Sequence, residues 1–368
     1  MGRMGRAVVL DRFNAPVTIR TYEVPDPGPG AILVRVRLAG ICGTDIHLSH
    51  GRLPIPLPVV LGHETVGIIE KLGNGVTADF LGNPLRVGDL VTWVPGIPCG
   101  RCYWCVIEKE RTLCPNRRVY GYLNVEEWPH FSGGWADYVY LVPGTTVLKV
   151  PDGITAEEVI SLGCAGPTAA HAVMFRAQIR AGDTIVIQGS GPVGIAAAMY
   201  AKLRGAAKVI IVGGPKERLD LCKRLGIGDV HINIFEDPNP NERVSHILDE
   251  TEGRRGADLT IEATGNPEAV PEGIMMTRRG GTYLVVGHYT DRGSVPINPH
   301  YITRGHLDIR GCWGIGEAHF LAYLRLLPQL KGRYELARLI QIYPLEHAEQ
   351  AMRDVEQWKV MKGVLQIT

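Results

Sequence analysis

The stretch that decides the fold is TIVIQGSGPVG, residues 184–194. Five residues typical of a buried strand, Thr184–Gln188, lead into the pattern G-x-G-x-x-G, and a helix-forming run, Val193–Arg204, follows. A strand, a glycine turn and a helix in this order form the pattern that binds the pyrophosphate of a dinucleotide. The stretch therefore predicts a nucleotide site on an α/β sheet.

Each residue of the turn has a distinct expected role. Gly189 makes the tight turn, Gly191 lets the backbone approach a pyrophosphate, and Gly194 lets the helix pack closely on the strand. Proline suits the first turn of a helix, whose N-terminus then faces the anion. A glycine-rich turn without a ligand is the structural alternative. The expected nucleotide-binding residues of this turn are Gly189, Gly191, Pro192, Val193 and Gly194.

The residues after the second expected strand, Lys208–Val212, bear on the choice between NAD and NADP. Dinucleotide sites usually place Asp or Glu about 20 residues beyond the glycine turn, where it binds the ribose 2′-hydroxyl. Gly213 stands at that position here, and Lys216 and Arg218 follow it. The missing carboxylate and the two cations favour a 2′-phosphate, and hence NADP. Alternatively both charges are solvated residues of a helix start, and NAD binds through backbone groups.

The pattern on the two sides of residue 165 differs. After it, strands and helices alternate, which implies a parallel sheet with right-handed crossovers. Before it, short β-type runs alternate with glycine and proline turns, which predicts a β-rich domain. The expected strands of the β-rich part are 31–38, 65–72, 89–94 and 136–142; those of the alternating part continue at 258–263 and 282–286, with a helix at 217–224, and further helices are expected at 318–327 and 346–358.

Four cysteines lie within residues 99–114, CGRCYWCVIEKERTLC. The spacing C-x2-C-x2-C-x8-C lets four thiolates surround one zinc ion without help from distant chain. Such a shell leaves no open position, so the site is expected to be structural. Two disulfides, free thiols or an iron–sulfur cluster are the alternatives. The predicted ligands are Cys99, Cys102, Cys105 and Cys114.

A second set of metal-binding residues comes from three separate segments. Cys42 lies in AGICGTDIH, His63 and Glu64 lie in LGHET, and Cys164 lies in SLGCAGP. Together they offer two thiolates, an imidazole and a carboxylate, and three ligands with an exchangeable fourth position make a catalytic zinc site. Taken singly, each has a structural explanation, such as a small buried cysteine. Asp45 is a possible hydrogen-bond acceptor for His63, or only a turn cap.

Composition excludes several classes of function. The 368 residues carry a net charge of +1, which gives no global field to attract nucleic acid or an acidic membrane. The longest uncharged apolar stretch, near Val193–Ala201, is shorter than the ~20 residues that span a bilayer. The first residues lack the apolar core of a signal peptide. We expect a cytoplasmic protein, in which the remaining thiols, Cys222 and Cys312, are buried and inert or, alternatively, redox-sensing.

The motifs GICGTDIH, GHE, the four-cysteine segment, GCAGPTAAH and QGSGPVG occur in this order. With them the chain resembles the zinc-containing medium-chain alcohol dehydrogenases over essentially its whole length. The resemblance implies a GroES-like catalytic domain, residues 1–165 and 310–368, around a Rossmann domain, residues 166–309. It also implies a homo-oligomer, a tetramer rather than a dimer, and no nucleic-acid partner.

The resemblance also implies roles for individual residues. Cys42, His63 and Cys164 would bind the catalytic zinc ion, and Glu64 would enter its shell during ligand exchange. Thr44 matches the hydroxyl that bonds the substrate alcohol, and His47 matches the histidine that ends the proton relay. The four-cysteine segment would hold the structural zinc ion.

Hydride transfer between an alcohol, or its aldehyde or ketone, and NAD(P) is the expected reaction. A polyol, sugar or threonine-type dehydrogenase is the alternative, although related polyol enzymes usually carry a carboxylate where Cys164 stands. A non-catalytic nucleotide-binding protein lies outside that class. Departures from the family are Gly43, where animal enzymes carry a pyrophosphate-binding arginine, and the long segments 73–88 and 119–132. These departures leave the substrate class open.

Overall fold

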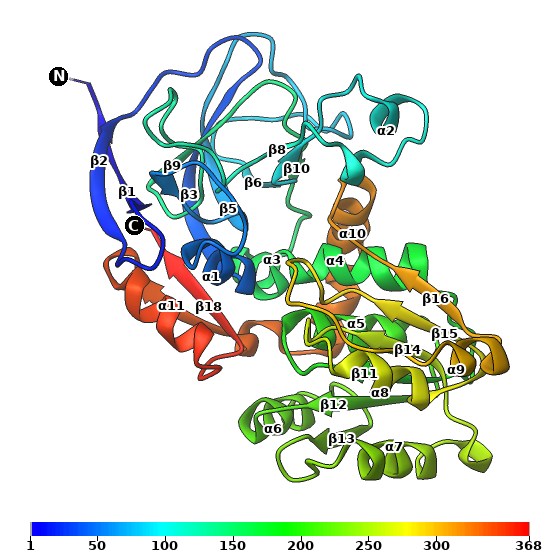
Figure 1. Ribbon diagram of the computed structural model, residues 1–368. Helices are drawn as coiled ribbons and strands as arrows, with labels where there is room; N and C mark the ends of the chain where they lie inside the picture. The colour runs from blue at the N-terminus through cyan, green and yellow to red at the C-terminus, as the bar shows by residue number, and fades with distance from the viewer. Residues whose placement is uncertain (1, 368) are drawn as a thin grey trace. The chain divides into compact units, whose positions relative to one another are not determined.

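The computed structural model describes residues 2–367, which form two compact units (Figure 1). The first unit contains the chain up to Cys164, Ile315–Lys331 and the chain from Leu336 onward. The second unit contains Ala165–Gly314 and Gly332–Glu335. Within the described residues, no helix combines the length and the apolar character that crossing a bilayer requires.

The second unit is built on a six-stranded parallel sheet in the order β13-β12-β11-β14-β15-β16. Numbered along the chain this order is 3-2-1-4-5-6, the doubly wound arrangement whose strand order reverses between its first and fourth strands. Ligands bind such sheets at the carboxyl ends of these two strands. They are β11 (Thr184–Gln188), which has the expected bounds, and β14 (Ala257–Glu262).

The central strands of this sheet are buried because helices cover it. Ile185, Val186 and Ile187 of β11 are fully buried, as in a parallel sheet covered on both faces. Helices α5 and α8 contact its central strands. The other strands are β12 (Lys208–Gly213), β13 (Val230–Asn233), β15 (Thr277–Val285) and β16 (Asp308–Gly311); the helices are α4 (Ala165–Ala170), α5 (Pro192–Leu203), α6 (Lys216–Arg224), α7 (Pro240–Asp249), α8 (Ala269–Met276) and α9 (Pro299–Gly305).

Two expectations for the second unit need adjustment. The strand expected from Thr282 begins five residues earlier, at Thr277, because Ala257 pairs with Thr277 before the register shifts at Leu259. The unit also reaches Gly314 rather than residue 309, because β16 pairs with β15 as the edge of the parallel sheet.

The first unit is β-rich. Its main sheet has the order β10-β6-β5-β3-β18-β17, with β9 also paired to β3, and a second sheet has the order β2-β1-β4. The strands are β1 (Met4–Leu10), β2 (Thr18–Glu23), β3 (Ile32–Ile41), β4 (Val59–Val60), β5 (Thr65–Leu72), β6 (Leu90–Trp93), β7 (Gly96–Ile97), β8 (Arg118–Val119), β9 (Tyr138–Leu141), β10 (Val147–Lys149), β17 (Ile340–Pro344) and β18 (Lys362–Gln366); the helices are α1 (Gly43–Ser49), α2 (Tyr103–Val106), α3 (Ala156–Leu162), α10 (Glu317–Arg333) and α11 (Ala348–Glu356).

Strand β3 connects distant parts of the first unit. It pairs antiparallel with β5 and with β18, so that Gly363 lies opposite Ile41 although more than 300 residues separate them. The strand runs to Ile41 rather than ending at residue 38, and therefore delivers Cys42 at its end. The buried Trp135 donates its Nε1–H to the Gly40 carbonyl at 3.2 Å and its backbone N–H to the Leu61 carbonyl at 3.1 Å. These bonds hold the segments that carry Cys42 and His63 together.

The long segment 73–88 of the first unit is held by hydrogen bonds to Asp79. Asp79 accepts hydrogen bonds from the backbone N–H groups of Leu81, Asn83 and Lys149 at 2.9, 2.9 and 3.1 Å, which fix the segment 73–88.

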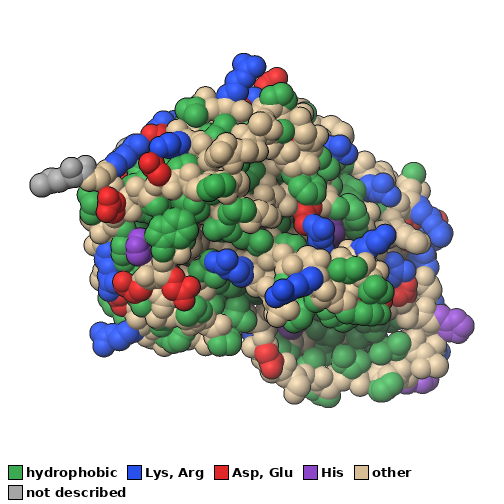
Figure 2. Space-filling model, turned by 90° about the horizontal axis from the view of Figure 1, so that it is seen from above, with side chains coloured by type: hydrophobic (Ala, Val, Ile, Leu, Met, Phe, Trp, Pro, Cys, Tyr) green, Lys and Arg blue, Asp and Glu red, His purple; other side chains and the backbone are tan. Residues whose placement is uncertain are grey.

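The surface of the molecule carries charges of both signs. Figure 2 shows Lys and Arg side chains interspersed with acidic and hydrophobic ones on the face it displays.

Candidate functional site

Four metal-binding side chains predicted from three segments lie together in the first unit. Cys42 follows β3, His63 and Glu64 precede β5, and Cys164 follows α3. One sulfur, nitrogen or oxygen atom of each lies within 4.8 Å of those of the others, and the two sulfur atoms are 3.3 Å apart. Two sulfur donors and an imidazole suit zinc, so the residues present fit a zinc ion.

Asp45 organises the segments around this cluster. Its Oδ2 accepts the backbone N–H of Cys42 at 2.8 Å and caps α1, while its Oδ1 lies 3.2 Å from Nδ1 of His63. The two roles considered for Asp45, a turn cap and a partner of His63, are therefore both filled. Because Nδ1 is engaged, Nε2 of His63 is the nitrogen left to bind a metal.

The electrostatics of the cluster favour a thiolate. The hydrogen bond from Cys164 lowers the pKa of Cys42 to about 5 despite burial, and the same bond raises the pKa of Cys164 well above its ordinary value. Burial opposes the charged form of His63, but the Asp45 carboxylate raises its pKa well above the usual range. Since the thiolate is the form that binds metals, Cys42 is already in the binding form at neutral pH.

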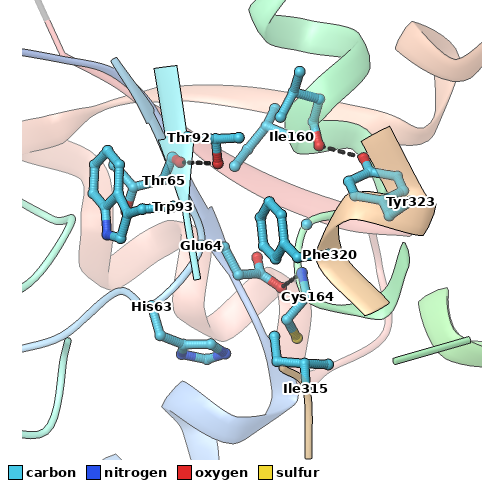
Figure 3. A pocket seen from close by; sticks show the side chains of 12 residues that line it. His63, Glu64, Thr65, Thr92, Trp93, Ile160, Cys164, Ile315, Phe320 and Tyr323 are labelled. Carbon is cyan, nitrogen blue, oxygen red and sulfur yellow. Dashed lines mark hydrogen bonds between the residues drawn. The ribbon is translucent and has the colours of Figure 1, made fainter. Parts of the chain in front are cut away.

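Glu64 lies beside the sulfur atoms, and each of its carboxylate oxygens has a hydrogen-bond or ion-pair partner. Its Oε1 accepts the backbone N–H of Cys164 at 2.8 Å, as the dashed line in Figure 3 shows, and its Oε2 is ion-paired with Nζ of Lys362. Burial would raise the pKa of Glu64, but the charge of Lys362 outweighs it and lowers this pKa. Sequence reasoning missed Lys362. The available signal was a charged residue at the start of the apolar run Gly363–Leu365 of β18 (Lys362–Gln366).

Apolar side chains close one side of the cluster. Figure 3 shows Phe320 beside Glu64, with Ile160 and Trp93 further out and Ile315 next to Cys164. They line a small pocket with a cavity volume of about 10 Å³, which is about the space of one water molecule. Glu64 is thus enclosed on this side by groups that cannot stabilise its charge.

Helix α1 holds the residues expected to handle the proton. Thr44 is in its first turn, with Oγ1 3.7 Å from Sγ of Cys42. His47 follows three residues later and therefore lies on the same face of the helix. The structure thus places Thr44 at the metal-binding cluster and His47 one turn beyond it.

The four-cysteine segment forms a second cluster in the first unit. Its four sulfur atoms lie within 4.8 Å of one another, and none is in a disulfide. Sγ of Cys102 is 3.5 Å from Sγ of Cys105, and the backbone N–H of Cys99 points to Sγ of Cys114 at 3.3 Å. Backbone N–H groups, that of Arg101 foremost, lower the pKa of Cys99 to about 6, whereas burial raises that of Cys105 to about 12. The geometry and the donor set fit a tetrahedral zinc ion.

The glycine turn in the second unit has the expected geometry. Gly189 has a φ of +117°, a conformation that side-chain-bearing residues rarely adopt. A Cβ on Gly194 would overlap the Gly189 carbonyl, so α5 approaches β11 as closely as it does only because Gly194 has no side chain. Gly191 is the N-cap of α5, and Pro192 is its first residue, followed by Val193. The turn lies at the carboxyl end of β11, where the strand order reverses.

Two further residues shape this edge of the sheet. Ser190 Oγ accepts the backbone N–H of Gly214 at 3.1 Å, and a Cβ on Gly213 would lie 2.7 Å from Ser190, which leaves no room for the usual acidic side chain. Glu262, fully buried at the end of β14, accepts the N–H groups of Gly265 and Gly287 at 2.7 and 3.0 Å. Sequence reasoning identified neither Ser190 nor Glu262.

The two basic residues after β12 differ in their surroundings. Lys216 is exposed at the first position of α6, and its Nζ forms an ion pair with Asp220 at 2.8 Å. Arg218 is half-buried, and burial lowers its pKa to about 10. A phosphate would therefore compete with Asp220 for Lys216.

Comparisons with known proteins agree with this architecture. Residues 28–152 match the family model described as "Alcohol dehydrogenase GroES-like domain", and residues 192–329 match the model "Zinc-binding dehydrogenase". The 5-exo-hydroxycamphor dehydrogenase of Pseudomonas putida is 37% identical over 99% of both chains. The D-xylulose reductase A of Aspergillus oryzae is 33% identical over 91% of this chain and 88% of its own.

A solved structure gives the same result. The alcohol dehydrogenase of Thermotoga maritima has a TM-score of 0.92 and 37% sequence identity, over 99% of this chain and all of its own. Its similarity and the two family models support a GroES-like domain and a parallel-sheet nucleotide-binding domain in a zinc-binding family. A protein of Sinorhizobium meliloti, described as a zinc-binding dehydrogenase and solved bound to NADP, has a TM-score of 0.84 and 27% identity over 99% of both chains, which supports NAD(P) as the coenzyme. The protein is a zinc-type oxidoreductase, and its chain belongs to the zinc-containing medium-chain alcohol dehydrogenase family.

Proposed function

We propose that Cys42, His63 and Cys164 hold a catalytic zinc ion and that the turn at residues 189–194 binds the pyrophosphate of NAD(P). The convergence of the Cys42, His63, Glu64 and Cys164 ligand atoms to within 4.8 Å is the observation that carries the proposal. In this assignment the first unit is the catalytic domain and the second unit is the nucleotide-binding domain.

The zinc ion, when bound, supplies a Lewis acid that polarises the substrate oxygen. Thr44, beside the metal ligands on α1, would accept the proton of the substrate hydroxyl at its Oγ1 and at the same time release its own hydroxyl proton to the relay. His47, one turn further along the helix, receives that proton at the end of the relay. Asp45 keeps the His63 ring oriented, and the apolar wall around Phe320 excludes bulk water from the Glu64 side. The nicotinamide, when bound at the turn, would supply the acceptor for the hydride of the carbinol carbon.

A secondary alcohol on an apolar ring is the proposed substrate class. Its support is the hydroxycamphor dehydrogenase, which matches nearly the whole chain and whose name states a hydroxyl on a compact apolar skeleton. A polyol is the second candidate, because a D-xylulose reductase is among the relatives. Cys164 in the ligand set favours an alcohol as substrate, since related polyol enzymes usually carry a carboxylate at this position.

A second, structural zinc ion is proposed at Cys99, Cys102, Cys105 and Cys114, which would bring the content to two zinc ions per chain.

A cytoplasmic homotetramer is also proposed. The eight free cysteines support a reducing compartment, since such a compartment keeps thiols available to metal. Sedimentation equilibrium tests the tetramer.

NADP is the proposed coenzyme in preference to NAD. The lack of space for a carboxylate at Gly213, beside Ser190, supports it, as do the cations Lys216 and Arg218 on α6. Because Lys216 is already paired with Asp220, the expected preference for NADP over NAD is limited.

Initial rates test the substrate class and the coenzyme together. NAD and NADP are each combined with cyclic secondary alcohols, primary alcohols, polyols and threonine, and the absorbance of the reduced nicotinamide is followed. We expect the highest kcat/KM for a cyclic secondary alcohol with NADP. Turnover confined to polyols would move the assignment to the second candidate. A clear preference for NAD would mean that Lys216 and Arg218 do not bind a coenzyme phosphate.

The substitution Gly194→Ala tests the nucleotide site. The added methyl group overlaps the Gly189 carbonyl and pushes α5 away from the turn, so we expect the KM for the nucleotide to rise by about tenfold or more, the equivalent of about 1.4 kcal/mol. The zinc content should not change. Gly332→Ala is the matched control, since a Cβ there meets no atom within 4 Å. Equal nucleotide KM values for the two variants would contradict the assignment.

A further inference from the structure

The ion pair between Lys362 and Glu64 is enclosed by protein. The Lys362 side chain is 2% exposed and the Glu64 side chain is fully buried. A buried carboxylate needs a positive partner, because no water stabilises its charge. Lys362 forms the ion pair with Glu64, the imidazole of His63 is a second group whose charge favours the carboxylate, and the metal-binding sulfur atoms of Cys42 and Cys164 lie nearby.

The fold fixes this pair from both sides. Lys362 is the first residue of β18, and the next residue, Gly363, pairs with Ile41 of β3 next to Cys42. The Glu64 backbone is bound to β3 as well, because its carbonyl accepts the backbone N–H of Gly40 in β3 at 2.9 Å. The lysine and the glutamate thus reach the metal-binding cluster from opposite sides of β3, which pairs with β18 on one side and with β5, directly after Glu64, on the other.

Two glycines leave room for the carboxylate in this position. A Cβ on Gly40 would overlap Oε2 of Glu64 and lie 3.1 Å from Cε of Lys362. A Cβ on Gly163 would lie 2.5–2.7 Å from the carboxylate carbon and oxygens. Together with the Cys164 N–H on Oε1, these contacts fix the carboxylate against Lys362, with one of its oxygens within 4.8 Å of the ligand atoms of Cys42, His63 and Cys164.

We propose that Lys362 is a positioning residue that holds the Glu64 carboxylate away from the catalytic zinc ion, so that Glu64 reaches the ion only after it leaves Lys362. This inference rests on the catalytic zinc site proposed above. The carboxylate has two competing cations, the ammonium group on β18 and the metal ion, and the ammonium group sets its resting position. The open position at the metal then remains free for the substrate.

Removing the ammonium group shifts this competition toward the metal. In a Lys362→Met variant the carboxylate keeps the Cys164 N–H, but the metal ion is its remaining positive partner. Glu64 should therefore bind the metal as an additional ligand and occupy the position that the substrate uses. Since groups that orient metal ligands commonly change metal affinity by about 10- to 100-fold, we expect zinc at this site to be released to a chelator about tenfold more slowly.

Cobalt substitution gives a direct readout of the ligands. The full chain is loaded with Co²⁺, and the visible absorption of Lys362→Met is compared with that of the unmodified protein. Subtracting the spectrum of the unmodified protein from that of the variant removes the absorption of cobalt at the four-cysteine site, which is the same in both proteins. We expect the bands of the catalytic site to change in position and to lose intensity, as an oxygen ligand is added. In Lys362→Arg, which keeps the positive charge, the bands should return to those of the unmodified protein.

Two controls separate positioning from stability. Lys331→Met removes a surface ion pair with Glu158 and should leave the spectrum and the release rate unchanged. In the double variant Lys362→Met, Glu64→Gln, the spectrum should match that of Glu64→Gln alone, because no carboxylate remains to bind. A folded Lys362→Met variant with an unchanged spectrum and release rate would overturn the proposal.

Glu64→Gln keeps the test valid if Lys362→Met does not fold. Because Glu64 rests on Lys362, this isosteric change should leave the resting cobalt spectrum unaltered, and a large change would show that Glu64 is a resting ligand and refute the proposal. Failure of the proposed function gives a different result: the unmodified protein would then take up no cobalt at Cys42, His63 and Cys164.

Discussion

Replacing Cys42 by serine is expected to lower kcat/KM about a thousandfold or more and to remove one of the two proposed zinc ions per chain. A metal ion acting as a Lewis acid contributes several kcal/mol to the stabilisation of the transition state, and each 1.4 kcal/mol corresponds to a factor of ten in rate. Cys42 is the residue of the cluster whose pKa is lowered to about 5, so its loss removes the preformed thiolate. Initial rates and zinc analysis by atomic absorption measure both effects.

The control for this change is Cys222→Ser. Cys222 is a fully buried thiol of α6 in the second unit, outside both cysteine clusters. Its replacement should leave the zinc content unchanged and the rate within a few-fold. Full activity of Cys42→Ser with the zinc of that site absent would refute the assignment of the catalytic centre.

Replacing Cys105 by serine is expected to remove the other zinc ion and to lower Tm by roughly 5–10 °C, since loss of a metal belongs to the most destabilising changes. The segment 99–114 has little packing of its own: α2 has four residues, and the side chains of Tyr103, Val106 and Ile107 are 57%, 51% and 64% exposed. The proposed zinc ion would therefore be its main support. Calorimetry and zinc analysis check the result.

A matched variant for this second test is Cys312→Ser, which changes a buried thiol outside both clusters. It should retain both zinc ions. The Cys105→Ser protein should still carry zinc at Cys42, His63 and Cys164, because the two clusters share no residue. An unaltered zinc content and Tm in Cys105→Ser would show that the four cysteines are free thiols, one of the alternatives open from the sequence.

The sequence predicted those features whose chemistry depends on short, regular spacing. The four cysteines of residues 99–114 lie close in the chain, so their convergence needs little tertiary structure. The strand, turn and helix around Gly189 are equally local, and β11 has the expected bounds. The cluster around Cys42 was predicted because the residue types suit zinc, although the meeting of its segments depends on β3, β5 and α3.

Features set by long-range pairing could not be predicted. Lys362 meets Glu64 across 298 residues, and although a charge at the start of β18 is noticeable, no local pattern identifies Glu64 as its partner. Lys216 and Arg218 were grouped as phosphate ligands because both are cations near the turn. Their environments differ, since Lys216 is exposed and paired with Asp220, whereas Arg218 is half-buried and burial lowers its pKa to about 10. Burial of a long side chain depends on tertiary contacts that a local pattern does not contain.

The pairing of β3 with β18 has a consequence for biosynthesis. A ribosome makes β3, His63 and Glu64 early and makes β18 only after the whole of the second unit. The usual order, in which N-terminal domains fold first, is therefore reversed: the nucleotide-binding sheet can be complete while the metal-binding sheet still lacks a central strand. During that interval Glu64 has no ammonium partner. Zinc that arrives on the nascent chain would meet a free carboxylate, and the arrival of Lys362 would then release the ion's open position for catalysis.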